Sequence, residues 1–190
     1  MVQSFLQFDQ FIIALLFWLL IVLVSLPFFL RYLVRRAWFI QSGNDFIPLT
    51  SLKKQLMAIN SYNSPVIIQK KRKKLLVGWR YNDPEWSERM AILGIRKSYF
   101  AKLVFDQNTR TVNISDKIKH VNFDLSPIRV RSSWLFRPRL YCSVQIKPDK
   151  DILLFKEQKA EQYHFSPQEI KTPLCNTFIQ NGWNVRFDLF

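Results

Sequence analysis

The densest group of functional side chains in the sequence is a run of five consecutive cations. These are Lys70, Lys71, Arg72, Lys73 and Lys74. The run lies between the apolar stretches VIIQ and LLVGW, which have the length and β-branched composition of two neighbouring strands. We therefore expect the cations at the tip of a hairpin, where each would contribute about 1 kcal/mol of attraction to an anionic bilayer. Contact with anionic lipid is favoured over a solvated turn and over a nucleic-acid contact.

A second basic segment alternates arginines with aromatic residues. Its members are Arg129, Arg131, Arg137 and Arg139, interleaved with Trp134, Phe136 and Tyr141. Arginines beside exposed aromatic rings can bind single-stranded nucleic acid. However, Val130, Trp134 and Phe136 share one parity, which predicts the core face of a strand. Arg129, Arg131 and Arg137 would then form a basic outer face suited to lipid or to an acidic partner protein.

The sequence predicts no catalytic residue, no metal site and no cofactor. A structural zinc site would need all four of its His and Cys residues. His120 and His164 stand alone in strand-like runs, and Cys142 and Cys175 fall where free Cys acts as a small hydrophobe. Neither GxGxxG nor a P-loop pattern occurs. A hydrolase or transferase using Cys142 or a carboxylate is the less favoured alternative.

These candidate surfaces follow an uncharged apolar segment at residues 11–30. Twenty helical residues rise about 30 Å, the thickness of the hydrocarbon core, so the segment predicts a single transmembrane helix. A cleaved signal peptide would begin with basic residues and end with small ones. Residues 1–10 contain neither Lys nor Arg, and no such cleavage site follows. We therefore expect an anchor preceded by a short extracytoplasmic tail.

The charges that flank this segment predict its orientation. Arg31, Arg35 and Arg36 follow it directly, and no basic residue precedes it. The positive-inside rule then places the N-terminus outside and the remainder in the cytoplasm. With Trp38, these arginines would form an interfacial collar within a juxtamembrane helix and linker over residues 31–44. All 28 Lys and Arg follow residue 30, against 13 of the 14 acidic residues, so that part carries a net charge of +15.

Residues 45–190 predict one β-rich, mostly antiparallel α+β domain with two or three short helices. Amphipathic spacing indicates a helix over 49–59, capped by Thr50 or Ser51. A second helix follows Asp83, which precedes a proline. Short extended runs predict roughly seven to nine strands. Among them are RTVNIS, IKHVNFDL and ILLFKEQ.

The strongest local pattern is near the C-terminus. Ser166 and Glu169 form a capping box at the start of a helix. Its apolar stripe is Ile170, Leu174, Cys175, Phe178 and Ile179. Pro173 is expected to bend or shorten this helix, which Asn181 and Gly182 would end. Alternation from Trp183 to Leu189 predicts a final strand.

The strings VGWRYNDPEW, GIRKSYFAKLVFD, EIKTPL and NGWNVRFDLF resemble a group of bacterial membrane-tethered proteins of unknown function. The resemblance implies a bacterial origin and a compact β domain behind a membrane span, and it implies no catalytic residue. We therefore expect a membrane-anchored, non-enzymatic accessory or scaffolding protein. Its basic cytoplasmic domain would contact anionic lipid or an acidic partner. A membrane-tethered nucleic-acid or ribosome-binding module is the alternative.

Overall fold

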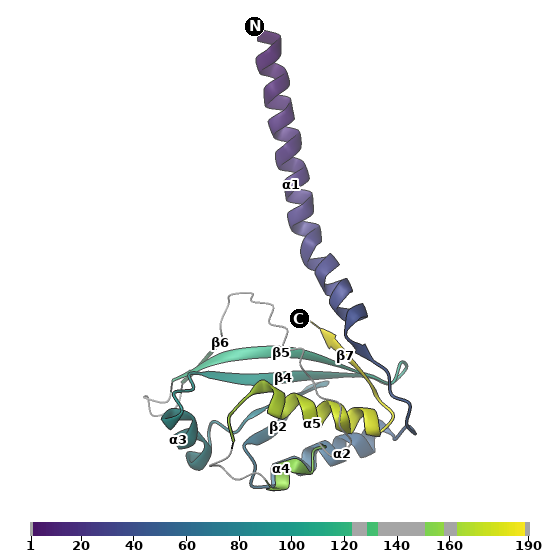
Figure 1. The fold of residues 1–190 in the computed structure, drawn as a ribbon, viewed down its shortest axis with the longest axis vertical. Helices are drawn as coiled ribbons and strands as arrows, with labels where there is room; N and C mark the ends of the chain where they lie inside the picture. The colour runs from purple at the N-terminus through teal and green to yellow at the C-terminus, as the bar shows by residue number, and fades with distance from the viewer. Residues whose placement is uncertain (1, 123–128, 133–150, 158–162, 189–190) are drawn as a thin grey trace. The chain divides into compact units, whose positions relative to one another are not determined.

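The structure is a computed structural model that describes residues 2–122, 129–132, 151–157 and 163–188. It divides into two compact units, the first ending at Ala37 and the second beginning at Trp38. Within the described ranges, the second unit is an α+β domain with a mixed sheet and several helices (Figure 1).

The first unit is the helix α1, Val2–Ala37. Its segment Gln10–Ala37 has a mean hydropathy of 2.9, and none of its most apolar window is buried. The helix is therefore long and apolar enough to cross a membrane. The helix begins at Val2, so it includes most of the residues expected as a short extracytoplasmic tail, and their place relative to a membrane stays a prediction. Within the expected juxtamembrane helix and linker over residues 31–44, the helix ends at Ala37 and Phe39–Ile40 forms a strand, β1.

The sheet has the strand order β1-β7-β5-β4-β3-β2, with β6 also paired to β5. The bounds of the remaining strands are β2 Val66–Lys71, β3 Lys74–Trp79, β4 Lys97–Asp106, β5 Thr111–Asn122, β6 Arg129–Ser132 and β7 Asn184–Asp188. Every pairing among the described strands is antiparallel except that of β5 with β7. The sheet is thus mixed, with the antiparallel arrangement predominating as the sequence predicts.

Strand β5 organises this topology. One of its edges pairs with β4 from Thr111 to His120. Its other edge is shared, because residues 111–115 pair with β7 and residues 119–122 pair with β6. The two runs RTVNIS and IKHVNFDL were expected as separate strands, and that division is wrong. They lie on one strand because the pairing with β4 continues without a break through Asp116 and Lys117.

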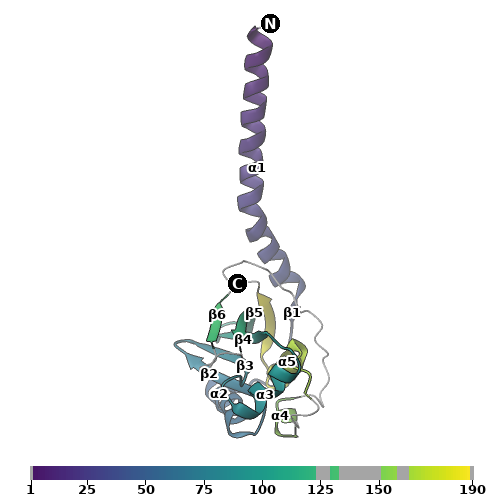
Figure 2. The ribbon, with the colours of Figure 1, turned by 90° about the vertical axis from the view of Figure 1, so that its left-hand side faces the viewer.

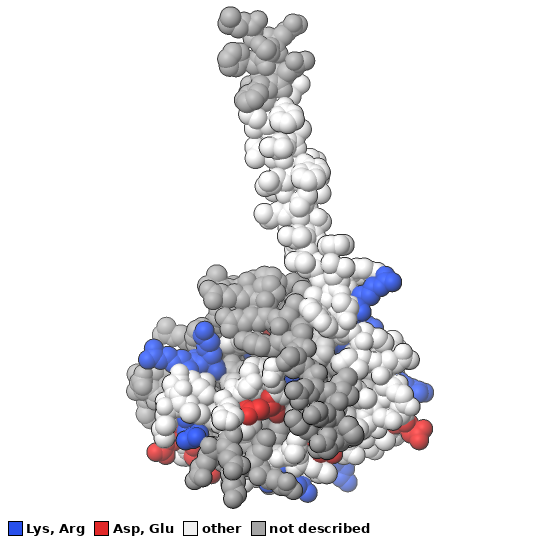
Figure 3. All heavy atoms as spheres, in the orientation of Figure 1, with Lys and Arg blue, Asp and Glu red and all other residues white. Residues whose placement is uncertain are grey.

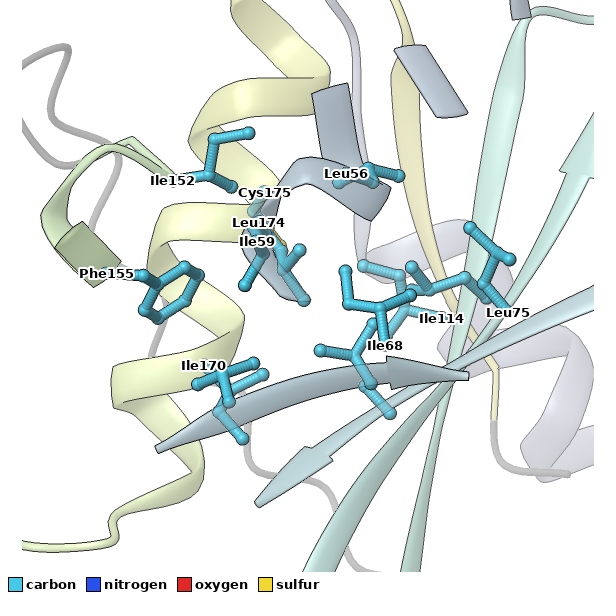
Figure 4. Close-up of a cluster of buried hydrophobic side chains, with 14 of the residues drawn as sticks. Leu56, Ile59, Ile68, Leu75, Ile114, Ile152, Phe155, Ile170, Leu174 and Cys175 are labelled. Carbon is cyan, nitrogen blue, oxygen red and sulfur yellow. The ribbon is translucent and has the colours of Figure 1, made fainter. Parts of the chain in front are cut away.

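The helices are α2 Leu49–Ala58, η1 Ile59–Ser61, α3 Pro84–Ile92, α4 Leu154–Glu157 and α5 Pro167–Gln180. Residues from α2, α3, α4 and α5 join strand residues in one buried hydrophobic cluster. Figures 1 and 2 show these helices gathered on one face of the sheet. Figure 4 shows the middle of the cluster, where Leu56, Phe155 and Leu174 approach Ile68 and Ile114 of the sheet.

Local signals account for the starts of α3 and α5. The Asp83 carboxylate accepts a hydrogen bond from the Glu85 N–H at 3.2 Å, and Ser166 with Glu169 forms the expected capping box. Helix α5 runs through Pro173 to Gln180, so the proline does not end it. The expected cap at Thr50 or Ser51 is wrong, since α2 starts at Leu49 after Pro48 and has no side-chain cap.

The run ILLFKEQ was expected to be extended, and it instead contains α4. The Asp151 carboxylate accepts a hydrogen bond from the Leu153 N–H at 2.8 Å, which starts a helical turn. The Ile152 N–H donates to the Thr177 hydroxyl of α5 at 3.1 Å. Ile152 and Phe155, three residues apart, are both buried against α5. This spacing favours a helical turn over a strand.

Candidate anion-binding groove

The five cations lie at the tip of the β2–β3 hairpin, as the sequence predicts. Lys71 pairs with Lys74, which leaves Arg72 and Lys73 as the two turn residues. All five side chains are exposed. Arg72 has φ of 55°, in the left-handed region that usually takes Gly or Asn. A non-glycine residue there costs about 1–2 kcal/mol of backbone strain, so this tip holds a cation at an energetic expense.

Helix α2 adds two further cations to the hairpin. Its buried stripe, Leu52 and Leu56, packs into the core. Lys53 and Lys54 therefore lie beside the hairpin, and the two elements enclose a hollow of about 260 Å³. Its lining residues are Thr50, Lys53, Lys54, Met57, Lys70, Arg72, Lys73, Lys74 and Leu75. No acidic side chain is among them.

A second, wider hollow of about 610 Å³ adjoins the first. Its lining residues are Leu49, Lys53, Arg72, Lys73, Phe105, Asp106, Gln107 and Asn108. Lys53, Arg72 and Lys73 line both hollows and thus form a shared rim between them. We call the two hollows together the basic groove, and its cations are Lys53, Lys54, Lys70, Arg72, Lys73 and Lys74.

Lys53 is the most firmly positioned of these cations. Its side chain is half-buried, and its Nζ lies 5.5 Å from the centroid of the Phe105 ring. Phe105 in turn packs edge-on against Phe178 and Trp183, at centroid separations of 6.1 and 5.9 Å. A cation held over an aromatic ring loses little further freedom when it binds a ligand. Lys53 is therefore preorganised, whereas Lys54 is simply exposed.

The one acidic lining residue of the groove, Asp106, belongs to the second hollow. Its carboxylate accepts hydrogen bonds from the Thr109 hydroxyl at 2.8 Å and the Asn108 N–H at 3.0 Å. The Thr109 hydrogen bond is the main reason that the pKa of Asp106 lies below 3.8. Asp106 is thus ionised at neutral pH. Among the described residues, no carboxylate forms an ion pair with a groove cation.

The other basic residues named from the sequence lie elsewhere. Arg31, Arg35 and Arg36 occupy the C-terminal part of α1. Arg129 and Arg131 are in β6. Arg137 and Cys142 lie outside the described residues, as do the aromatic residues Trp134, Phe136 and Tyr141. Lys71 does not line either hollow. In Figure 3, Lys and Arg side chains form separate groups along the margins of the domain on the face shown.

Trp38 was expected at the membrane interface. It is the first residue of the second compact unit and is partly buried against the hydrophobic cluster, and its place relative to a membrane stays a prediction. Its backbone carbonyl accepts a hydrogen bond from the Phe187 N–H at 3.2 Å. This contact fixes the start of the domain to its last strand.

A second polar cluster lies inside the core. Lys171 of α5 donates to the Asp116 carboxylate of β5 at 2.8 Å, and the Tyr99 hydroxyl donates to the same carboxylate at 2.7 Å. The Lys171 ammonium also lies 4.8 Å from the centroid of the Phe187 ring. The side chains of Lys171 and Asp116 are 2% and 11% exposed. A buried ion pair with an added donor fixes α5 against the sheet.

Cys175 lies one turn after Lys171 and is fully buried, as its place on the predicted stripe indicates. Burial is the main cause that raises the pKa of its thiol to about 12, with Lys171 acting in the opposite direction. A thiol that stays protonated and inaccessible is a poor nucleophile. Within the described ranges, no three His, Cys, Asp or Glu residues gather as metal ligands.

The sequence did not predict three residues of these sites, namely Lys53 and Lys54 of the groove and Lys171 of the buried polar cluster. Lys53 and Lys54 belong to the helix expected over residues 49–59, but nothing in the sequence indicates that this helix lies beside the hairpin. Lys171 shares a helix face with Cys175, four residues later, so a cation on the apolar stripe was the available signal. Comparison of the chain with protein-family models, curated proteins and solved structures finds no match.

Proposed function

We propose that this chain is a membrane-anchored, non-enzymatic accessory or scaffolding protein. Its basic cytoplasmic domain would contact anionic lipid or an acidic partner protein. The observation that carries the proposal is the groove, where α2 and the β2–β3 hairpin gather six cations around two hollows in a chain that begins with a long apolar helix. The resemblance to bacterial membrane-tethered proteins and the Arg31, Arg35 and Arg36 flank support a bacterial plasma membrane with the N-terminus outside.

Electrostatics make anionic lipid a well-matched partner for the groove. Each cation near an anionic leaflet contributes about 1 kcal/mol, and the attraction decays over about 8 Å at physiological salt. Such contacts are individually weak, but an anchor in the same membrane keeps the groove close to its target. The effective concentration of lipid is then high enough for weak contacts to be occupied.

Vesicle binding by the second compact unit, residues 38–190, tests the lipid proposal. Replacing Lys70, Lys71, Arg72, Lys73 and Lys74 with Gln should abolish most sedimentation with vesicles that contain phosphatidylglycerol. A matched control compares two double variants that remove the same charge. Lys73→Gln/Lys74→Gln changes the groove, and Arg96→Gln/Lys97→Gln changes a site outside it. Lys97 begins β4, and Lys74 pairs with Val104 of that strand, so the two sites are about 23 Å apart. Equal losses from both pairs would show that total charge, and not the groove, controls binding.

An acidic partner protein is tested by crosslinking in native membranes, followed by purification and mass spectrometry. A recurrent acidic partner, lost in the Lys73→Gln/Lys74→Gln variant, would support the accessory role. The six cations also match the charge of a nucleic-acid backbone, which makes a membrane-tethered nucleic-acid binder the second candidate. That candidate predicts strong absorbance at 260 nm in the purified protein, and crosslinked partners that disappear after nuclease treatment.

A further inference from the structure

We infer that the shared rim of the basic groove, formed by Lys53, Arg72 and Lys73, binds the terminal phosphate monoester of a lipid headgroup. This inference rests on the proposed function and names the ligand of the same site. Its basis is the arrangement of the two hollows, because these three cations border both of them whereas Lys54, Lys70 and Lys74 border only the first.

The shape of the groove favours a discrete anionic group over a flat charged surface. A flat membrane is best contacted by a protruding basic patch, whose cations all meet it at once. Here the cations of the hairpin face those of α2 across a hollow of about 260 Å³, so an anion between them is approached from two sides. Converging charges select a small ligand that can enter the hollow.

The donor set matches a phosphate monoester better than a diester. A monoester carries a charge of about −1.5 to −2 at pH 7 and has three strong acceptor oxygens. The rim supplies three cations, of which Arg72 can donate two parallel hydrogen bonds and the two lysines one or more each. A diester has a single charge and two unsubstituted oxygens, so it would leave part of this rim unused.

The walls of the groove fix the direction in which the ligand lies. Met57 is 39% exposed and lines the first hollow together with Leu75 and the Thr50 hydroxyl. This side offers apolar surface to the carbon atoms attached to the phosphate. The lining of the second hollow includes the ionised Asp106, which repels an anion. The phosphate is therefore held at the shared rim, with its glycerol part over Met57.

The test uses the full chain in phosphatidylcholine nanodiscs and follows acetylation of each lysine by mass spectrometry. Inclusion of phosphatidic acid should slow the acetylation of Lys53 and Lys73, relative to Lys97 in the same molecule. Phosphatidylglycerol, included at equal total charge, should protect these lysines several-fold less. Soluble glycerol 3-phosphate and inorganic phosphate, added to neutral nanodiscs, should compete with phosphatidic acid for the same protection.

Two neighbouring lysines give a matched pair of variants. Lys53→Gln and Lys54→Gln remove the same charge from neighbouring positions of α2, yet only Lys53 borders both hollows. Protection of Lys73 by phosphatidic acid should require at least about tenfold more lipid in Lys53→Gln, from loss of one charged hydrogen bond. Lys54→Gln should require no more than about threefold more, since it loses only longer-range attraction.

Three results would overturn the inference in distinguishable ways. Equal protection by phosphatidic acid and phosphatidylglycerol, with equal effects of the two variants, would leave a general anionic-lipid contact and remove the monoester site. Protection by soluble glycerol 3-phosphate but not by phosphatidic acid would show that the source is not a lipid. Absence of protection by any anionic lipid, together with no vesicle binding by residues 38–190, would refute the proposed lipid contact as well.

Discussion

The substitution Lys171→Met tests whether the buried ion pair is a necessary part of the domain. Met keeps most of the volume of the Lys stem but removes the charge that Asp116 contacts at 2.8 Å. Loss of one partner from a buried pair costs about 3–5 kcal/mol, because the other charge remains buried. The Tyr99 hydroxyl still donates to Asp116, whose side chain is 11% exposed, so the lower end of that range is expected.

A loss of about 3 kcal/mol is a large part of the 5–15 kcal/mol that stabilises a typical domain. With a urea dependence of about 2 kcal/mol per M, it corresponds to a shift of about 1.5 M in the unfolding midpoint. The assay is urea unfolding of the full chain in mild detergent, followed by tryptophan fluorescence. Trp79, Trp86 and Trp183 are buried in the hydrophobic cluster, so their emission reports on the same core.

The double variant Lys171→Met/Asp116→Leu is the control, because it removes both charges. It should be markedly more stable than Lys171→Met alone, since no charge is then left buried. Tyr99→Phe should cost only about 1 kcal/mol, the usual contribution of one hydrogen bond. A midpoint shift below about 0.5 M for Lys171→Met, or additive effects in the double variant, would refute our account of the pair.

Three further predictions concern the hairpin tip, the buried thiol and the glycines. Arg72→Asn relieves the left-handed strain at φ 55°, so it should raise the melting temperature by about 2–4 °C. It should also weaken binding of glycerol 3-phosphate, because a groove cation is lost. A fall in both the melting temperature and the binding would contradict this prediction. In a Cys142→Ser background, Cys175 should react with iodoacetamide at pH 8 only after unfolding. Because the pKa of Cys175 is raised from 9.0 to about 12, the unfolded thiol ionises first. The free energy of unfolding should then fall by about 1.4 kcal/mol per pH unit between these values, a slope that Cys175→Ala lacks. Gly43→Ala has open space and should be neutral, and Gly94→Ala at φ +64° should cost about 1 kcal/mol. Gly182→Ala should cost at least about 3 kcal/mol in the same urea assay, since its Cβ would collide with the backbone of Asp45 and Phe46.

Features written into short stretches of sequence were predictable. The capping box at Ser166, the cap at Asp83 and the hairpin around Arg72 each depend on residues within a few positions of one another. The middle of helix α1, residues 11–30, likewise follows from an uncharged apolar run. Local backbone hydrogen bonding and side-chain entropy decide these elements, so no knowledge of the rest of the chain is required.

Features that depend on distant partners were not predictable. ILLFKEQ has the composition of a strand, and it becomes partly helical because Thr177 and the core beside α5 accept Ile152 and Phe155. The groove forms only when α2 lies against the hairpin, which requires the whole sheet as a support. Lys171 and Asp116 likewise form an ion pair although they are 55 residues apart in the sequence. Tertiary packing decides all three.

The position of β7 has a consequence for synthesis. This strand lies between β1 and β5, although β1 is the first and β7 the last of the described strands to be made. The ribosome must therefore synthesise the chain through β7 before the sheet can close, while α1 has long since left the exit tunnel. During that interval, β1 and one edge of β5 lack the partner that later satisfies their backbone groups. A chain terminated before Asn184 would retain every groove cation and yet lose Val185 and Phe187 from the core, so we expect quality-control proteases to remove it.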